Sequence, residues 1–216
     1  MNYLFNHPSG VNYQINIDNP HVEKGMKANG KLYEYYLLEH IEKQHGKRGN
    51  ILDIGAHVGN HSIYFGLFCA DNVYAFEPQE SNVKRFDENI MLNDLDNVKL
   101  FPYALGDELC KMGMRRRNDR IDCLAYEMHG KGEYPIYKLD DVVDGEITNI
   151  KVIKIDVEGF DCKVLLGGEE TIRKNRPSIY IEYAENMKQI DKFLFGLGYK
   201  KGVQFRQGTA IQEFIP

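Results

Sequence analysis

Acidic residues stand at the ends of four predicted strands, where they could contact a cationic or hydroxyl-bearing ligand. They are Asp53, Glu77, the pair Asp156 and Glu158, and Glu182. A single acid after a strand is ordinarily a helix cap or part of a turn. In an open parallel sheet, however, ligands bind outside the carboxyl ends of the strands, so acids at several strand ends should converge. The pattern therefore predicts one acidic site assembled from distant segments.

The turn after the first of these strands is rich in glycine. It reads DIGAHVGNHS, so that Asp53 is followed by Gly55 and Gly59 before a helix begins. Glycines permit a tight turn and let backbone N–H groups approach a ligand. The dinucleotide pattern Gly-x-Gly-x-x-Gly is absent, because His57 stands two residues after Gly55. A carboxylate here disfavours a pyrophosphate and favours a ligand that carries an amino group or a sulfonium.

Glu77 ends the next strand and is a candidate for ribose binding. An acid at this position can accept hydrogen bonds from both hydroxyls of a ribose, in nicotinamide sites and in S-adenosylmethionine (SAM) sites alike. By itself, Glu77 beside Pro78 could equally be a negative charge at the N-terminus of the next helix. Because Asp53 and the glycine-rich turn precede it, we interpret Glu77 as a ribose ligand.

Strand and helix patterns alternate through most of the chain, which predicts a parallel sheet with helices on both faces. The apolar spacing predicts strands at 50–55, 72–78, 97–105, 150–156 and 178–183, a C-terminal hairpin at 202–215, and helices at 31–43, 60–70, 81–92, 161–175 and 186–199. Residues 108–139 interrupt this rhythm and read as a small β insertion with a turn at Asn118-Asp119.

Size and composition indicate a folded single domain. The chain has 216 residues and a formal net charge of −5, which argues against a nucleic-acid partner. Its four cysteines show neither a disulfide framework nor zinc spacing. The N-terminus lacks a signal-peptide pattern, and no apolar stretch is long enough to span a membrane. We therefore expect a cytoplasmic protein; nothing in the pattern predicts its oligomeric state.

Several stretches, taken in order, resemble the FkbM family of class I SAM-dependent methyltransferases. They are YEYYLLEHI, NILDIGAHVGNHSIYF, VYAFEPQESNVKRFDENIMLND, YALGD, YKLDDVV and VIKIDVEGFDCKVLLGGEETIRKNRPSIYIE. The element KIDVEG with the helix after it is the most specific of them. The resemblance implies an α/β, Rossmann-like, doubly wound and mostly parallel seven-stranded sheet with an antiparallel C-terminal hairpin. One domain, 1–216, would comprise a helical, substrate-side extension (1–49) and a cofactor-binding core (50–216).

The resemblance also implies the cofactor contacts. These would come from Asp53, Gly55, Ala56, His57, Gly59, Glu77, Asn93 and Ala104. The glycine-rich turn would line the methionine part of SAM, with Asp53 at its amino end. Asn93 and Ala104 are the weaker candidates, on the adenine side. His57 stands where the family often has asparagine, and 108–139 departs from the family pattern and is expected to shape the acceptor site.

Family members typically methylate hydroxyl groups of sugars or natural products, with S-adenosylhomocysteine (SAH) as the product. Asp156 is the best-placed general base for such a hydroxyl, followed by Glu158 and Glu182. Alternatively, these acids bind the hydroxyls of the acceptor or balance the sulfonium charge. A magnesium ion held by Asp156, Glu182 and Asn186 is a further possibility that we do not favour, so no metal ligand is predicted.

Three more residues are expected on the substrate side, namely Tyr33, Glu34 and Lys154. Glu34 is placed near the pocket by the resemblance, although a solvated helix face explains it equally well. Lys154 lies on a buried strand, so that either its neighbours pair its charge or its amine reaches solvent at the rim. His61, at a helix start, is expected to be a cap or a wall of the site.

Two other functions compete with methyl transfer. One is a nicotinamide-dependent oxidoreductase, against which the DIGAHVG spacing argues. The other is a module that binds SAM without catalysis, against which the presence of Asp156 and Glu158 argues.

Overall fold

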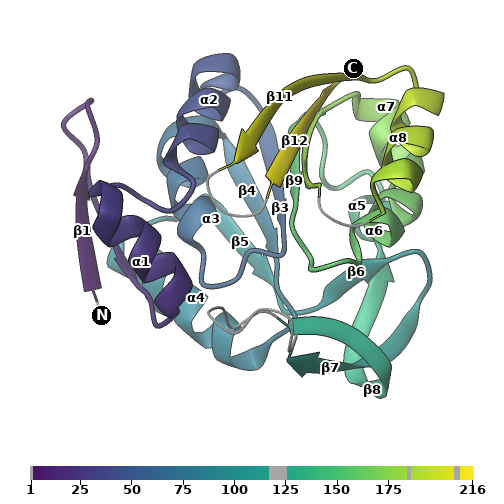
Figure 1. Ribbon diagram of the computed structural model, residues 1–216, viewed down its shortest axis with the longest axis horizontal. Helices are drawn as coiled ribbons and strands as arrows, with labels where there is room; N and C mark the ends of the chain where they lie inside the picture. The colour runs from purple at the N-terminus through teal and green to yellow at the C-terminus, as the bar shows by residue number, and fades with distance from the viewer. Residues whose placement is uncertain (1, 117–125, 184–185, 207–209) are drawn as a thin grey trace.

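The computed structural model describes residues 2–116, 126–183, 186–206 and 210–216. Within these residues, a seven-stranded sheet with the order β11-β12-β10-β9-β3-β4-β5 forms the centre of the molecule (Figure 1). Its strands are β3 (Asn50–Ile54), β4 (Asn72–Phe76), β5 (Val98–Phe101), β9 (Ile150–Ile155), β10 (Ser178–Glu182), β11 (Lys200–Arg206) and β12 (Ala210–Ile215). Among the described residues of this sheet, only the pairings that involve β12 are antiparallel. The predicted mostly parallel sheet with an antiparallel C-terminal hairpin is confirmed.

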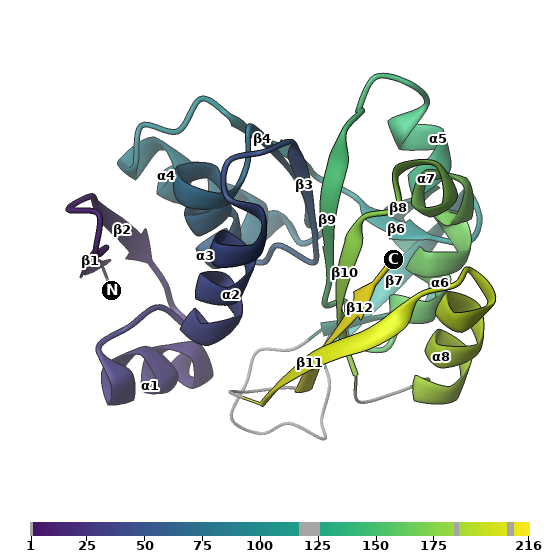
Figure 2. The same ribbon diagram turned by 90° about the horizontal axis from the view of Figure 1, so that it is seen from above.

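Helices cover both faces of this sheet (Figure 2). One side carries α1 (Pro20–Asn29), α2 (Tyr35–His45), α3 (Asn60–Tyr64), the π-helical turn η1 (Phe65–Cys69) and α4 (Glu80–Leu92). The other carries α5 (Leu139–Val143), α6 (Asp161–Gly167), α7 (Glu169–Asn175) and α8 (Met187–Gly196). Successive residues of a strand face opposite sides, so Ile51 and Leu52 of β3 belong to two different cores. Because both faces of the sheet are buried, the sequences of its strands are continuous apolar runs.

The order of the strands defines a switch point between β3 and β9. From β3 the chain continues to β4 and β5 on one side, and later to β9 and β10 on the other. The carboxyl ends of β3 and β9 therefore flank the crevice in which open α/β sheets bind ligands. The register places Asp53 of β3 directly beside Lys154 of β9.

Two predicted elements are each divided in the structure. The strand predicted at 97–105 is β5 followed by β6 (Ala104–Gly106), which belongs to a separate sheet. Pro102 lies between them and has no N–H with which to continue a ladder. The helix predicted at 161–175 is α6 and α7, which meet at Gly168, where a Cβ would lie 2.8 Å from the Leu139 side chain.

The predicted β insertion is a three-stranded sheet of order β6-β8-β7. Its long strands are β7 (Cys110–Arg116) and β8 (Tyr126–Lys138), which pair antiparallel. The turn predicted at Asn118-Asp119 lies outside the described residues. In Figure 1 this sheet lies at the lower right of the molecule, below α6.

The N-terminal extension differs from the helical segment expected at 1–49. It begins with an antiparallel pair, β1 (Asn2–Asn6) and β2 (Asn12–Asn16), before α1 and α2. The amides of Asn89 on α4 and of Asn93, the residue that follows this helix, each donate to and accept from the backbone of β2, at Asn16 and Gln14 respectively. These two side chains are four residues apart, so they lie on the same side of α4. They form hydrogen bonds with the β2 backbone in the place of a neighbouring strand. The strands are short, and the side chains that bind the backbone of β2 lie 73 and 79 residues further along the chain, so the local pattern did not reveal these strands.

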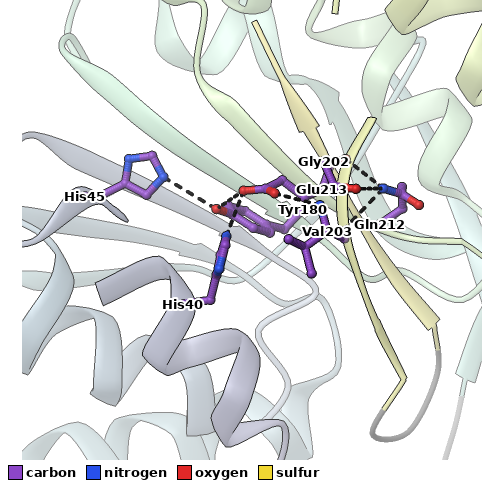
Figure 3. Close-up of polar contacts among 7 residues, drawn as sticks. All are labelled: His40, His45, Tyr180, Gly202, Val203, Gln212 and Glu213. Carbon is purple, nitrogen blue, oxygen red and sulfur yellow. Dashed lines mark hydrogen bonds and ion pairs between the residues drawn. The ribbon is translucent and has the colours of Figure 1, made fainter. Parts of the chain in front are cut away.

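The C-terminal hairpin fixes α2 against the sheet (Figure 3). Oε1 of the buried Glu213 accepts a 2.8 Å hydrogen bond from the Tyr180 hydroxyl and lies 2.9 Å from Nε2 of His40 on α2. Its Oε2 accepts from the backbone N–H of Val203, at a bulge in β11. Both carboxylate oxygens are therefore used internally, and the contacts hold α2 in place. The residue that precedes α2 is Glu34.

The sequence predicted neither a membrane-spanning segment nor a disulfide framework. In the described part of the chain, no helix is long and apolar enough to cross a membrane. Cys69, Cys110 and Cys162 are free thiols, and Cys123 lies outside the described residues.

Candidate functional site

A buried ion pair joins the carboxyl ends of β3 and β9. Asp53 is fully buried, and its Oδ2 accepts a 2.6 Å hydrogen bond from the Ser62 hydroxyl of α3. Its Oδ1 lies 3.4 Å from Nζ of Lys154. Lys154 is only 2% exposed, so its charge is paired inside the protein and does not reach solvent at a rim. This decides between the two sequence-based alternatives for Lys154.

Lys154 also contacts the two segments that follow the strands. Its Nζ lies 3.7 Å from Oδ2 of Asp156 and donates to the carbonyl of Gly55 at 3.3 Å. Burial alone would lower the pKa of Lys154, but the neighbouring carboxyl groups outweigh it and raise this pKa above the ordinary value. The side chain of Asp156 is 24% exposed, unlike that of Asp53, so Asp156 is the acid of this group that an incoming ligand can reach.

Glu34 joins this group from the start of α2. It is 5% exposed and has a left-handed backbone conformation, with φ 56°, which is strained for a residue with a side chain. Burial raises the pKa of Glu34 to about 8, the negative charge of Asp156 adds to the shift, and Lys154 opposes it. We call Glu34, Asp53, Lys154 and Asp156 the acid–lysine cluster. The alternative that Glu34 lies on a solvated helix face is wrong.

Two histidines border the acid–lysine cluster. His61 of α3 is 4% exposed, and its Nε2 lies 3.4 Å from Oε2 of Glu34. Burial lowers the pKa of His61 to about 3 and that of His57 to about 4, and the ammonium of Lys154 adds to both shifts. Both rings are therefore neutral at neutral pH, so among the described residues Lys154 is the cationic side chain in direct contact with Asp53 and Asp156.

The glycine-rich turn after β3 fits tightly against the end of β9. Gly55 has φ +83°, and a Cβ on it would lie 1.9 Å from the carbonyl oxygen of Asp156. Gly59 has φ +87°, and a Cβ there would lie 2.9 Å from the Phe86 ring. Ala56, between them, is buried. Both glycines are thus required by their positive φ and by a close neighbour.

Glu77, just after β4, is held in place by three donors. Its Oε2 accepts from the backbone N–H of His57 at 3.0 Å, and its Oε1 accepts from Gln79 N–H and the Asn82 amide at 2.9 and 3.3 Å. Burial raises the pKa of Glu77, and these hydrogen bonds oppose the rise. A carboxylate offers about four acceptor positions, so among the described residues about one remains for a ligand, on Oε2.

The loop after β9 is closed by a residue that sequence reasoning missed. Asp161, the first residue of α6, accepts hydrogen bonds from the backbone N–H groups of Val157 and Gly159. Burial raises the pKa of Asp161 to about 6, and the charge of Asp156 adds to this. Glu158 lies within the loop with φ +51°. An acid at the first turn of a helix is a recognisable capping signal, and it could have identified Asp161.

Four other predicted site residues, Asn93, Tyr33, Glu182 and Ala104, lie outside the acid–lysine cluster. Asn93 is engaged by the backbone of β2, and the Tyr33 ring packs on Gly25 of α1, with its hydroxyl 3.2 Å from Nε2 of His21. Glu182 is buried at the end of β10, opposite Ile211 of β12. Ala104 begins β6, close after the end of β5. The structure thus brings Glu34, Asp53, Lys154 and Asp156 together, whereas the Asn93 side chain and the Tyr33 ring contact residues of the N-terminal segment.

Comparison with known proteins agrees with this architecture. The family model described as the methyltransferase FkbM domain matches residues 53–201. A curated relative, the 2-O-methyltransferase NoeI of Sinorhizobium fredii (strain NBRC 101917 / NGR234), is 28% identical over 156 residues. The match covers 62% of this chain and 63% of NoeI, so the chain spans less than two thirds of that relative.

Solved methyltransferase structures share the fold. The crystal structure of methyltransferase FkbM from Methylobacillus flagellatus KT superposes with a TM-score of 0.57 at 16% identity, over 77% of this chain and 43% of that one. A Streptococcus mutans protein solved in complex with SAH gives 0.53 at 12% identity, over 86% and 98%. At these identities the likeness establishes the fold, which is that of class I methyltransferases.

Proposed function

Because the chain belongs to the methyltransferase FkbM domain family, we propose that it transfers a methyl group from SAM to a hydroxyl of a sugar or glycan. The observation that carries this proposal is the acid–lysine cluster at the switch point, where Asp156 is accessible. The relative NoeI, by its name a 2-O-methyltransferase, supports oxygen as the acceptor atom. The net charge of −5 favours a sugar acceptor over a nucleic acid.

The residues around the switch point fit SAM. Glu77 has an acceptor position for a ribose hydroxyl, and its carboxylate is fixed by three hydrogen bonds before any ligand arrives. The turn that contains Gly55 and Gly59 would lie against the methionine part. Asp53 is already bonded to Ser62 and Lys154, so it would act on the amino end through its charge, with any direct contact made by water.

When bound, SAM supplies a methyl group on a sulfonium, which makes that methyl electrophilic. The chain's own task is to position the acceptor and to take the proton of its hydroxyl. Asp156 is suited to the second role because its carboxylate is partly exposed while Lys154 fixes its orientation. Glu158, in the loop after β9, and Glu182, the last residue of β10, would bind other hydroxyls of the acceptor.

Cofactor binding can be tested by calorimetric titration with SAM, SAH and NAD. We expect both sulfur ligands to bind and NAD not to bind. Glu77→Ala should weaken SAM binding roughly 10- to 100-fold, because it removes a charged hydrogen-bond acceptor from the ribose. Glu80→Ala, a change of the exposed acid in the first turn of α4, is the matched control and should bind SAM normally.

Three results would reject parts of this proposal. If neither sulfur ligand binds, the methyltransferase function is wrong for this chain. Binding of NAD instead would favour an oxidoreductase. SAM binding without transfer to any acceptor would favour a module that binds the cofactor and does not catalyse.

A further inference from the structure

Glu34 and His61 face each other with no hydrogen-bond partner at their nearest atoms. Among the described residues, Oε2 of Glu34 and Nε2 of His61 are buried and unpartnered, and they lie 3.4 Å apart. The other ring nitrogen of His61 is engaged by the backbone of Tyr33, which fixes the tautomer. The ring nitrogen that donates to a carbonyl carries the hydrogen, so Nε2 presents a lone pair to the carboxyl group. Two acceptors buried this close repel each other unless one proton lies between them.

The charges around Glu34 and His61 determine whether this pair keeps its proton. Glu34 faces Asp156 and Lys154 from the β9 side and His61 from α3. His61 faces the same two charges and also His57. With the proton in place, the acid–lysine cluster holds two carboxylates and one ammonium. Ionisation of Glu34 would add a third carboxylate in a buried site, which is unfavourable unless another cation arrives.

We propose that the Glu34–His61 pair holds one exchangeable proton, which is released to solvent when a cationic ligand binds at the carboxyl ends of β3 and β9. This inference rests on the proposed function, in which the cation is the sulfonium of SAM. SAH carries a neutral thioether in its place, so its binding leaves the proton on the pair. The pair thereby makes the protein distinguish the methyl donor from the spent product by charge.

Linkage gives this inference a measurable consequence. The affinity for a ligand that displaces one proton rises with pH by up to about tenfold per unit below the pKa of the group. Because that pKa is about 8 for Glu34, SAM should bind more tightly between pH 6 and pH 8 as the pH rises. The affinity for SAH should change little over the same range.

The experiment is calorimetric titration at pH 7 in buffers with different ionisation enthalpies, which counts protons released on binding. We expect between roughly 0.5 and 1 proton per SAM bound, and much less for SAH. Glu34→Gln should abolish the release and make the dissociation constant of SAM independent of pH. The matched control is Glu39→Gln on the same helix, which alters an acid paired with Lys43 and should leave the release unchanged.

A second variant protects the test if Glu34→Gln folds poorly. His61→Gln offers an amide that can donate to an ionised Glu34, so the carboxyl no longer needs the proton and the release should fall. Equal release with SAM and SAH in the unaltered protein would overturn the inference, as would full release in folded Glu34→Gln. Failure of the proposed function shows differently, as an absence of binding by both ligands.

Discussion

Replacement of Lys154 by methionine is expected to destabilise the protein by about 3–5 kcal/mol, because removing one partner of a buried ion pair leaves the other charge uncompensated. Asp53 is fully buried and, among the residues that the structure describes, would retain the Ser62 hydroxyl as its hydrogen-bond partner. Equilibrium unfolding in urea, followed by circular dichroism, measures the free energy of unfolding.

Two further variants isolate the ion pair as the cause. Lys151→Met changes an exposed lysine on the same strand and should alter the stability by less than about 0.5 kcal/mol. The double variant Asp53→Asn with Lys154→Met removes both charges and should recover much of the loss. If Lys154→Met is as stable as Lys151→Met, the buried pair does not hold β3 and β9 together as described.

Gly55→Ala is expected to be the most damaging change in the turn after β3. The added methyl would lie 1.9 Å from the carbonyl oxygen of Asp156, which belongs to the backbone and has no rotamer by which to move away. The end of β9 would have to shift, and with it Asp156. We expect a loss of more than about 3 kcal/mol in unfolding free energy and loss of SAM binding in the protein that still folds.

Gly145→Ala is the matched control for this change. Gly145 has φ +79°, close to the +83° of Gly55, but a Cβ there would meet no atom within 4 Å. The unfolding free energy of Gly145→Ala should fall by about 1 kcal/mol, which is the cost of placing alanine in a backbone conformation with positive φ. Equal losses for the two variants would mean that the contact with Asp156 has no role, and that backbone strain alone requires Gly55.

The site residues that lie at the ends of strands could be predicted from the sequence. Asp53, Glu77 and Asp156 each follow an apolar run, and parallel strands bring their carboxyl ends to one edge of the sheet. Local spacing was sufficient for these residues. Their roles toward a cofactor stay predictions, since neither the fold nor the family match locates a bound ligand.

The remaining features of the site depend on contacts that spacing does not encode. Glu34 reaches the acid–lysine cluster only because α2 is fixed by Glu213 and His40, which are 173 residues apart. His61 was expected to be a cap or a wall, and its pairing with Glu34 needed the tertiary structure. Ser62 lies in the first turn of α3, but its hydrogen bond to Asp53 was not predicted, because it depends on the direction of α3 relative to β3.

The central claim is tested most directly by incubating the protein with SAM and a panel of monosaccharide glycosides, and by identifying the products by mass spectrometry and NMR. We predict an O-methylated sugar together with an equal amount of SAH. Asp156→Asn should slow transfer roughly 100-fold or more while SAM still binds, and Asp141→Asn, at an exposed acid of α5, should not. Methylation that proceeds equally well in Asp156→Asn, or SAM that binds but is never consumed with any sugar, would contradict this account.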